Sequence, residues 1–263
     1  MRIFAAGDFH GVVPKKFRKY AKGCDLMLCT GDMANRDEER RLIFKYWKES
    51  EQGLLLDLFI PPKKYQKLIL GGINSMKPVV REIDGYGIRV FTTNGNGDFE
   101  KVKIKHKTKR VKLSKFVSFE ELVEQSRHIE FIRCGIKNLS DEYQLVAYGN
   151  AYIDPRKEKK LLRKLFSKID KKRKQIFLTH EPPFRTKLDI AGYGPSKGKH
   201  LGSRAISWAI KEYKPVLHIS GHIHESQGFA KLGRTVCVNT GYGRKGEAAV
   251  IELNKKIKIK LLK

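Results

Sequence analysis

The chain has 263 residues, with 55 Lys and Arg against 28 Asp and Glu and a formal net charge of +27. This length provides ample core for one or two domains. The chain has no apolar run long enough to span a bilayer and no signal-like start, so we expect a cytoplasmic protein without a membrane partner. The charge favours phosphate-bearing partners, nucleic acid first. The alternative is a Lys-rich surface that only solvates an ordinary enzyme.

The first two predicted strands each end in glycine and acidic residues. Residues 2–6 form a short apolar run into Gly7-Asp8-Phe9-His10-Gly11, and 25–30 form a second run into Gly31-Asp32. Glycine lets the backbone turn sharply, which aims Asp8 and His10 into one space. Asp8 as the cap of a helix near Pro14 is an alternative, but it leaves His10 unexplained.

Two helices and a third strand are predicted next. Residues 37–50 carry a helical apolar stripe, which we expect to be core. Residues 67–83 predict a second helix, broken at Pro78. Residues 88–93 predict a strand that ends in Gly95-Asn96-Gly97-Asp98. A third strand end thus delivers polar side chains.

Lys and Arg fill eight of the fifteen positions from 101 to 115. Alternation with apolar residues predicts either an exposed strand with one basic face or a basic arm, an insertion near 100–117. Residues 129–132 and 144–148 are predicted to pair as strands around a turn. Asp154-Pro155 predicts the start of a helix with a basic outer cover.

The second half adds three imidazoles. Residues 175–179 predict a strand that ends in His180, and the strand after Pro215 ends in Gly221-His222-Ile223-His224. Imidazoles in a His-x-His pattern are plausible metal ligands. Strands at 235–239 and 248–253 complete the chain. Because polar clusters span nearly the whole length and must converge, we expect a single domain over residues 1–263.

Taken together and in order, Asp8-x-His10, Gly31-Asp32, Gly95-Asn96-x-Asp98, His180 and Gly221-His222-x-His224 resemble the motifs of the calcineurin-like metallophosphoesterase superfamily. The resemblance implies an α/β fold, a four-layer α/β/β/α sandwich, with a dinuclear metal centre. It assigns Asp8, His10 and His224 to one ion and Asn96, His180 and His222 to the other. Asp32 would bridge both ions, and Asn96 would also lie close to the phosphate.

The residue types support such a site independently. Carboxylates, imidazoles and an amide suit two divalent ions of Mn, Fe, Zn or Co, of which we favour Mn. Two ions about 3.5–4 Å apart lower the pKa of a bridging water and clamp an in-line displacement. This chemistry predicts a phosphate-ester substrate that is cleaved by a metal-bridging hydroxide.

One position departs from the motifs. Much of the superfamily has histidine after the motif asparagine, whereas this chain has Gly97. That imidazole is commonly assigned to the leaving group, so its loss favours phosphodiester over phosphomonoester hydrolysis. Arg36 matches the Gly-Asp-x-x-x-Arg spacing of the protein phosphatases and would bind phosphate. It is equally consistent with an arginine at a helix start. The predicted catalytic residues are Asp32, Asn96 and Arg36.

Three functions follow. The first is a metal-dependent phosphoesterase, most readily a phosphodiesterase. The second is a nuclease or RNA-processing phosphodiesterase that uses the basic surface. The third is a non-catalytic protein-binding scaffold of the same fold, although all seven ligand positions are present. The sequence does not predict an oligomeric state.

Overall fold

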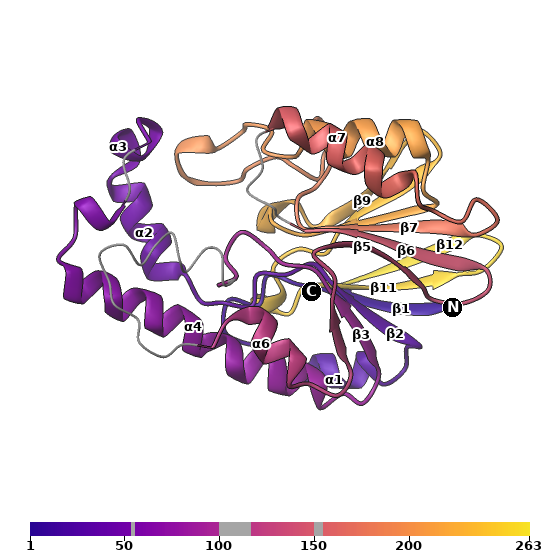
Figure 1. The fold of residues 1–263 in the computed structure, drawn as a ribbon, viewed down its shortest axis with the longest axis horizontal. Helices are drawn as coiled ribbons and strands as arrows, with labels where there is room; N and C mark the ends of the chain where they lie inside the picture. Colours follow the sequence, from indigo (N-terminus) through magenta and orange to yellow (C-terminus); the bar gives the residue numbers. More distant parts are fainter. Residues whose placement is uncertain (54–55, 100–116, 150–154) are drawn as a thin grey trace.

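A computed structural model of the chain describes residues 1–53, 56–99, 117–149 and 155–263, and its strands form two six-stranded sheets (Figure 1). The first sheet has the order β12-β11-β1-β2-β3-β4, and the second has the order β5-β6-β7-β8-β10-β9. The strands of the first sheet are β1 (Arg2–Ala6), β2 (Leu26–Cys29), β3 (Arg89–Thr92), β4 (Ile129–Phe131), β11 (Ala248–Leu253) and β12 (Ile257–Leu262). Those of the second are β5 (Cys134–Asn138), β6 (Tyr143–Tyr148), β7 (Lys174–Thr179), β8 (Leu217–Ser220), β9 (Gly228–Leu232) and β10 (Thr235–Asn239).

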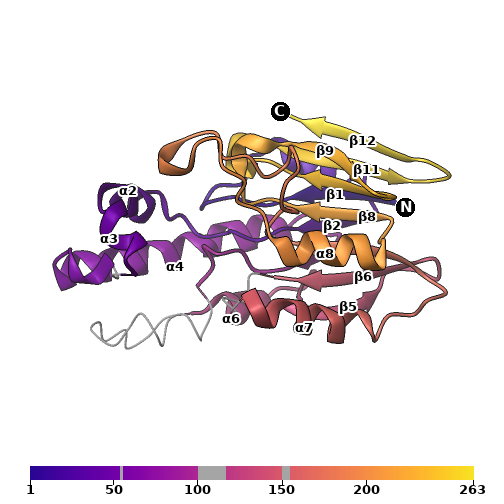
Figure 2. The ribbon, with the colours of Figure 1, turned by 90° about the horizontal axis from the view of Figure 1, so that it is seen from above.

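The two sheets pack face to face, and each is covered by helices on its outer side (Figures 1 and 2). Side chains alternate along a strand. On β1, Ile3 and Ala5 therefore join the core between the sheets, whereas Phe4 and Ala6 join the core beneath the helices of the first sheet. A third core lies between the second sheet and its own helices. The predicted four-layer α/β/β/α sandwich is confirmed.

The covering helices are amphipathic. In α4 the buried positions include Ile69, Ile73, Met76, Val80 and Ile83, three or four residues apart, which places them on one helical face. The helices over the first sheet are α1 (Lys16–Ala21), α4 (Pro62–Asp84) and α6 (Phe119–Glu124). The helices over the second sheet are α7 (Pro155–Phe166) and α8 (Arg204–Tyr213). Two further helices, α2 (Asp37–Lys45) and α3 (Trp47–Glu51), extend beyond the sheets.

Both sheets have a parallel centre, formed by β1-β2-β3-β4 in one and β6-β7-β8-β10 in the other. The loops that leave the carboxyl ends of these strands meet at one end of the sandwich, where open α/β sheets place their sites. The segment between β7 and α8 extends over the same end toward α2 and α3 (Figures 1 and 2). The 3₁₀ turns of the described residues are η1 (Leu56–Leu58), η2 (Gly194–Ser196), η3 (His224–Ser226) and η4 (Gly243–Lys245).

Three local predictions are wrong. β6 pairs antiparallel with β5, whereas β4 pairs with β3 in the other sheet, so 129–132 and 144–148 are not partners. Pro78 lies inside an unbroken α4, whose inner face remains packed in the first core on both sides of the proline. In the stripe at 37–50, Leu42 and Tyr46 pack against that core, but Trp47 lines an open cavity instead.

Two predictions fall largely outside the described residues: the basic arm near 100–117, and Asp154 as a helix cap. Within the described ranges, no helix combines the length and apolar character needed to cross a membrane.

Candidate metal centre

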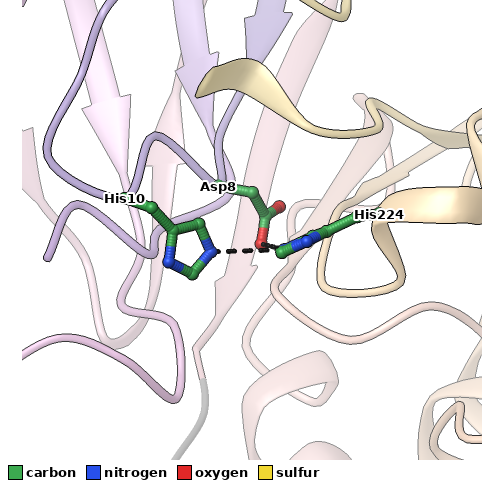
Figure 3. Close-up of side chains that lie close together, drawn as sticks. All are labelled: Asp8, His10 and His224. Carbon is green, nitrogen blue, oxygen red and sulfur yellow. Dashed lines mark hydrogen bonds and ion pairs between the residues drawn. The ribbon is translucent and has the colours of Figure 1, made fainter. Parts of the chain in front are cut away.

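The structure brings the seven predicted ligands together at the carboxyl ends of the strands. Asp8 and His10 follow β1, and His224 lies after β8 at the start of η3. The Nε2 atom of His224 lies 3.2 Å from Asp8 Oδ1 and 3.2 Å from His10 Nε2, and Figure 3 shows the three side chains converging from the two halves of the chain. All three are buried, and their ligand atoms lie within 4.8 Å of one another. This cluster is the predicted first ligand set.

The predicted second set converges around the ring of His180. Its Nε2 atom lies 2.9 Å from Asn96 Oδ1 and 3.1 Å from His222 Nδ1. These side chains follow β7, β3 and β8, so each comes from a different strand end. A group of ligand atoms within 4.8 Å of one another also joins His180 to Asp8 and Asp32.

Asp32 lies between the two clusters. Its Oδ2 atom is 3.8 Å from His10 Nε2 and also 3.8 Å from His180 Nε2. Its other oxygen accepts a hydrogen bond from the backbone N–H of Gly97 at 2.6 Å. One carboxylate oxygen therefore faces both ligand sets, while the second is held by the backbone.

The donor chemistry fits divalent ions. The carbonyl of Thr30 lies 2.8 Å from His180 Nδ1 and accepts its proton, which leaves the Nε2 lone pair of the neutral ring facing the acceptor Asn96 Oδ1. Burial lowers the pKa of His180, but the nearby Asp32 and Asp8 carboxylates outweigh burial and raise it. The position thus attracts positive charge, which a metal ion would supply.

The other ligands have protonation states suited to metal binding. Burial lowers the pKa of His10 to about 4 and that of His222 to about 3. Burial acts to raise the pKa of Asp8, but the hydrogen bond and charge of His224 lower it overall. For Asp32, electrostatic interactions with the His180 and His10 rings in their protonated forms likewise overcome burial and lower the pKa. At neutral pH these imidazoles are neutral and the carboxylates ionised, as coordination requires.

The backbone is strained at the same residues. Asp8, His10, Asp32 and His222 have φ values of 53°, 44°, 56° and 70°, in the left-handed region that residues with a Cβ rarely adopt. Such conformations cost free energy and persist where the surrounding structure fixes them, which is common at functional sites. The strained turns direct these four side chains to the cluster instead of along the strands.

Asp98 fixes the loops that carry Asp32 and Asn96. Its carboxylate accepts hydrogen bonds from the backbone N–H groups of Asp32 at 2.9 Å, Met33 at 2.7 Å and Gly95 at 2.8 Å. A Cβ on Gly95 would lie 2.0 Å from Asp32 Oδ1, so only glycine allows this close approach. The motif Gly95-Asn96-x-Asp98 therefore positions the motif Gly31-Asp32.

Arg36, the predicted phosphate ligand, is held by neighbouring groups. Its guanidinium pairs with the buried carboxylate of Glu39 through both Nε and Nη2, and Nη1 donates to the Asn96 carbonyl at 2.9 Å. It lines a cavity beside Asp32 and Gly97. The structure thus places Arg36 near the cluster, and its role toward phosphate stays a prediction.

Three residues near the cluster were missed by the sequence analysis. Arg40, one helical turn after Arg36, lines both cavities that reach Asp32. Tyr242 stacks on the His224 ring with centroids 4.2 Å apart, and Arg244 donates to the His10 carbonyl at 3.2 Å. For Arg40 the i+4 spacing was the available signal. For Tyr242 and Arg244 the available signal was the glycine-flanked turn at 241–243, which contains or directly precedes them.

Known proteins are similar to this chain over nearly its whole length. An uncharacterized protein of Methanocaldococcus jannaschii is 25% identical over 242 residues, which cover 91% of this chain and 87% of that protein. One crystal structure aligns over 100% of this chain and 99% of its own, with a TM-score of 0.69 and 17% identity. The crystal structure of TT1561 of Thermus thermophilus aligns over 98% and 97%, with a TM-score of 0.58 and 14% identity. At these identities the two structures show the fold alone.

The sequence model of one family extends over most of the chain. Its description is calcineurin-like phosphoesterase, and it matches residues 1–226, a range that holds all seven predicted ligands. The chain therefore belongs to the calcineurin-like phosphoesterase family.

Proposed function

We propose that this chain, a member of a hydrolase family that binds two divalent metals, hydrolyses phosphodiesters at the cluster around Asp32. The observation that carries the proposal is the position of Asp32 Oδ2, equally distant from His10 Nε2 and His180 Nε2. Asp8, His10 and His224 would hold one ion, and Asn96, His180 and His222 the other. The mixed oxygen and nitrogen donors suit Mn, Fe, Zn or Co, and we favour manganese.

Bound divalent ions supply an activated water and neutralise the charge of the phosphate. The residues of the chain orient the substrate. Asn96, at the junction of both cavities, is placed to contact a phosphate oxygen. Arg40 adds a positive charge to both cavities, and within the described part of the chain no carboxylate forms an ion pair with it. These groups favour binding of an anionic ester.

The preference for diesters rests on Gly97. Without a positioned acid to protonate the leaving group, the rate of cleavage falls by about 10²–10⁴-fold. His200, a candidate to replace the missing imidazole, donates from Nδ1 to the carboxylate of the buried Asp189 at 2.8 Å and packs on Phe184. His200 is not among the described residues that line the two cavities at Asp32. Esters with acidic leaving groups are therefore the best substrates.

The test is metal-dependent turnover. The purified protein is stripped with chelator, reloaded with Mn, Fe, Zn or Co in turn, and assayed with bis(4-nitrophenyl) phosphate and 4-nitrophenyl phosphate. We expect activity only after reloading, faster on the diester, and none in Asp32→Asn or His222→Ala. The exposed His128 provides a matched control, and His128→Ala should retain full activity. Full activity after exhaustive chelation contradicts the proposal.

A second candidate function is nucleic-acid binding. Around α7 and the turn that follows it, exposed basic side chains lie on the outer face of the second sheet: Lys157, Lys159, Lys160, Arg163, Lys164, Lys168, Lys171, Lys172 and Lys174. Lys159 and Arg163 also lie over the ring of Trp208, at 5.6 and 5.2 Å from its centroid. A basic face beside an aromatic ring is suited to a phosphate backbone.

Salt dependence tests this second candidate. Each phosphate contact contributes about −0.7 to −0.9 to the slope of log K against log salt. We expect Lys160→Glu combined with Lys164→Glu to make the slope for RNA binding shallower, by the amount that about one to two phosphate contacts contribute. The same reversal at Lys258 and Lys260, exposed on β12, is the control. Equal effects of the two pairs would mean that RNA binds to the overall positive charge of the surface and not to the face around α7.

The non-catalytic scaffold is the least supported function. A scaffold needs no metal ligands, whereas here seven such residues from five strand ends converge and four of them adopt strained backbone conformations.

A further inference from the structure

A cavity of about 200 Å³ opens beside the metal ligands. At one end it is lined by Asp32, Asn96, His222 and His224. At the other end it is lined by aromatic and apolar side chains from two separate segments: Phe44 and Trp47 of α2 and α3, and Tyr193, Pro195 and Leu201 of the 184–203 segment. One continuous space therefore joins the site of phosphate chemistry to an apolar wall.

The aromatic rings of this wall are only partly covered: Tyr193 is exposed, and Phe44 and Trp47 are half-buried. Phe44 contacts Trp47 edge to face at 6.1 Å and Tyr193 edge to face at 6.2 Å. Tyr193 is 45% exposed and Leu201 is 40% exposed. Three rings held at an angle to one another, each partly accessible, offer a ring face and a neighbouring edge against which a planar ligand group can pack.

Arg40 lies between the wall and the metal ligands. It lines the same cavity, and its Nη1 donates to the Tyr193 hydroxyl at 2.8 Å. This hydrogen bond joins α2 to the 184–203 segment and keeps the guanidinium beside Tyr193. A phosphate ester at the metal ligands would thus meet a cation next to it and aromatic rings beyond.

Resting on the phosphoesterase function proposed above, we propose that this cavity is a nucleobase subsite and that the substrates are nucleotide phosphodiesters. The base stacks on a ring of the wall formed by Phe44, Trp47 and Tyr193 and meets a neighbouring ring at its edge, while its phosphate lies at Asp32 and Asn96. A nucleobase is planar and compact, as the angled rings and the small volume require, whereas a lipid chain has no flat face to stack. Stacking tolerates any base, because every base has a π face.

Glu225 refines the expected ligand. This exposed residue lines the cavity, and in the described part of the chain no cation pairs with it. A carboxylate accepts hydrogen bonds from an exocyclic amino group of a base. Adenine, cytosine and guanine therefore fit the cavity better than uracil or thymine.

Binding tests the subsite independently of catalysis. The chain has two tryptophans, and Trp208 is part of α8 and faces the basic α7, so Trp208→Phe leaves Trp47 as the only indole. We expect AMP to quench the Trp47 fluorescence of this variant, with and without Mn, and ribose 5-phosphate to leave it unchanged. Calorimetry of AMP binding to the unaltered protein gives the same comparison if the variant fails to fold.

The wall is tested by paired variants. Phe44→Ala and Tyr193→Ala should weaken AMP binding about 5- to 100-fold, as loss of one stacking partner predicts. Tyr193→Phe keeps the ring and should keep most of the affinity. Phe229→Ala, at an exposed phenylalanine on β9 outside the cavity, is the control and should change nothing. Equal weakening of AMP and ribose 5-phosphate overturns the subsite.

Turnover separates this proposal from the one on which it rests. With Mn, adenosine 5′-(4-nitrophenyl phosphate) should be cleaved with a higher kcat/KM than methyl 4-nitrophenyl phosphate, and Phe44→Ala should lower only the former. Equal rates on both esters, with no quenching of Trp47, overturn the subsite but leave phosphodiester hydrolysis intact. Selective AMP binding with no cleavage of either ester overturns the hydrolysis and supports the subsite.

Discussion

The backbone N–H of Gly97 donates a hydrogen bond of 2.6 Å to Oδ1 of Asp32. A Cβ on residue 97 would lie 2.9 Å from that oxygen and 3.1 Å from Cγ of Asp32. The glycine that replaces the motif histidine thus approaches the proposed bridging carboxylate more closely than a side chain allows. The position of Asp32 and the identity of residue 97 are coupled.

This contact predicts that Gly97→His does not restore an acid. The Cβ must push the short Asp32 side chain aside, so we expect a loss of about 10- to 100-fold in metal affinity and activity, as for other disturbed ligand contacts. Gly97→Ala should show the same loss without an imidazole. Metal content and kcat on the same samples measure both effects.

Gly71→Ala is the matched control, since a Cβ there meets no atom within 4 Å. If Gly97→His instead binds metal normally and speeds the cleavage of esters with basic leaving groups, Asp32 adjusts more easily than its two contacts indicate.

In the unaltered protein we predict a steep dependence of rate on the leaving group. Among the described residues that line the cavity at Gly97, His10 is the one imidazole, and it is a predicted metal ligand, so an alcohol of high pKa departs without a proton donor. A series of substituted phenyl diesters, assayed with both ions loaded, measures the slope of log kcat against the leaving-group pKa. A shallow slope would show that another group protonates the leaving oxygen.

Asp98 should contribute to stability as well as to the site. Its carboxylate accepts three backbone hydrogen bonds, and bonds to charged groups contribute about 1.5–3 kcal/mol each when removed singly. Asp98→Asn removes the charge and replaces one acceptor oxygen with a donor that faces N–H groups. We expect unfolding at lower denaturant concentration and reduced metal binding. Unchanged metal affinity would mean that the loops hold their shape without this carboxylate.

The parallel strand order explains why the convergence of the predicted ligands could be expected from the sequence. Asp8, Asp32 and His180 each follow a buried apolar strand directly, and parallel strands deliver their ends to one edge. The pairing of β5 was not predictable in this way. Cys134–Asn138 is mostly exposed and has no apolar alternation, so its strand is specified by its partner β6. Pro78 was misjudged because tertiary packing of α4 outweighs a local helix-breaking preference.

The cavity wall was not predictable for another reason. Phe44 and Trp47 have the spacing of a core stripe, and a sequence does not show that the covering layer is absent on that side. Phe44 and Tyr193 are 149 residues apart in the sequence, and their contact in the structure shows that a cavity lies where a core was expected. Arg36 likewise matched a motif spacing, whereas the pairing with Glu39 depends on the geometry of one helical turn.

His218 predicts acid destabilisation. It is fully buried on β8, its Nε2 lies 2.8 Å from the Thr179 hydroxyl, and burial lowers its pKa to about 3. The unfolded state, with a pKa near 6.5, binds a proton that the folded state does not between about pH 3 and 6.5. Stability is therefore complete above pH 6.5 and falls as the pH drops, by up to about 1.4 kcal/mol per pH unit from this residue.

Denaturant unfolding of metal-free protein between pH 7 and pH 4 measures this slope. His218→Gln should make it shallower, whereas His128→Gln, at an exposed position, should leave it unchanged. Identical slopes in all three proteins would assign the acid sensitivity to the other buried histidines.

Arg36, at the N-cap of α2, and Arg40, within the helix, predict opposite phenotypes. Arg36 neutralises Glu39, which is 7% exposed, and removing one partner of a buried pair typically costs about 3–5 kcal/mol. Arg36→Met should therefore lower the free energy of unfolding with a smaller effect on phosphate binding.

Arg40 has no such partner among the described residues and lines both cavities, so Arg40→Met should leave stability almost unchanged. The same change should weaken inhibition by inorganic phosphate about 10- to 100-fold, as loss of a charge-assisted hydrogen bond predicts. Denaturant unfolding and competitive inhibition, measured on both variants, separate the roles. The reverse pattern, with phosphate affinity lost only in Arg36→Met, would mean that the Arg36 guanidinium leaves Glu39 when phosphate binds, and that the motif spacing identified the phosphate ligand correctly.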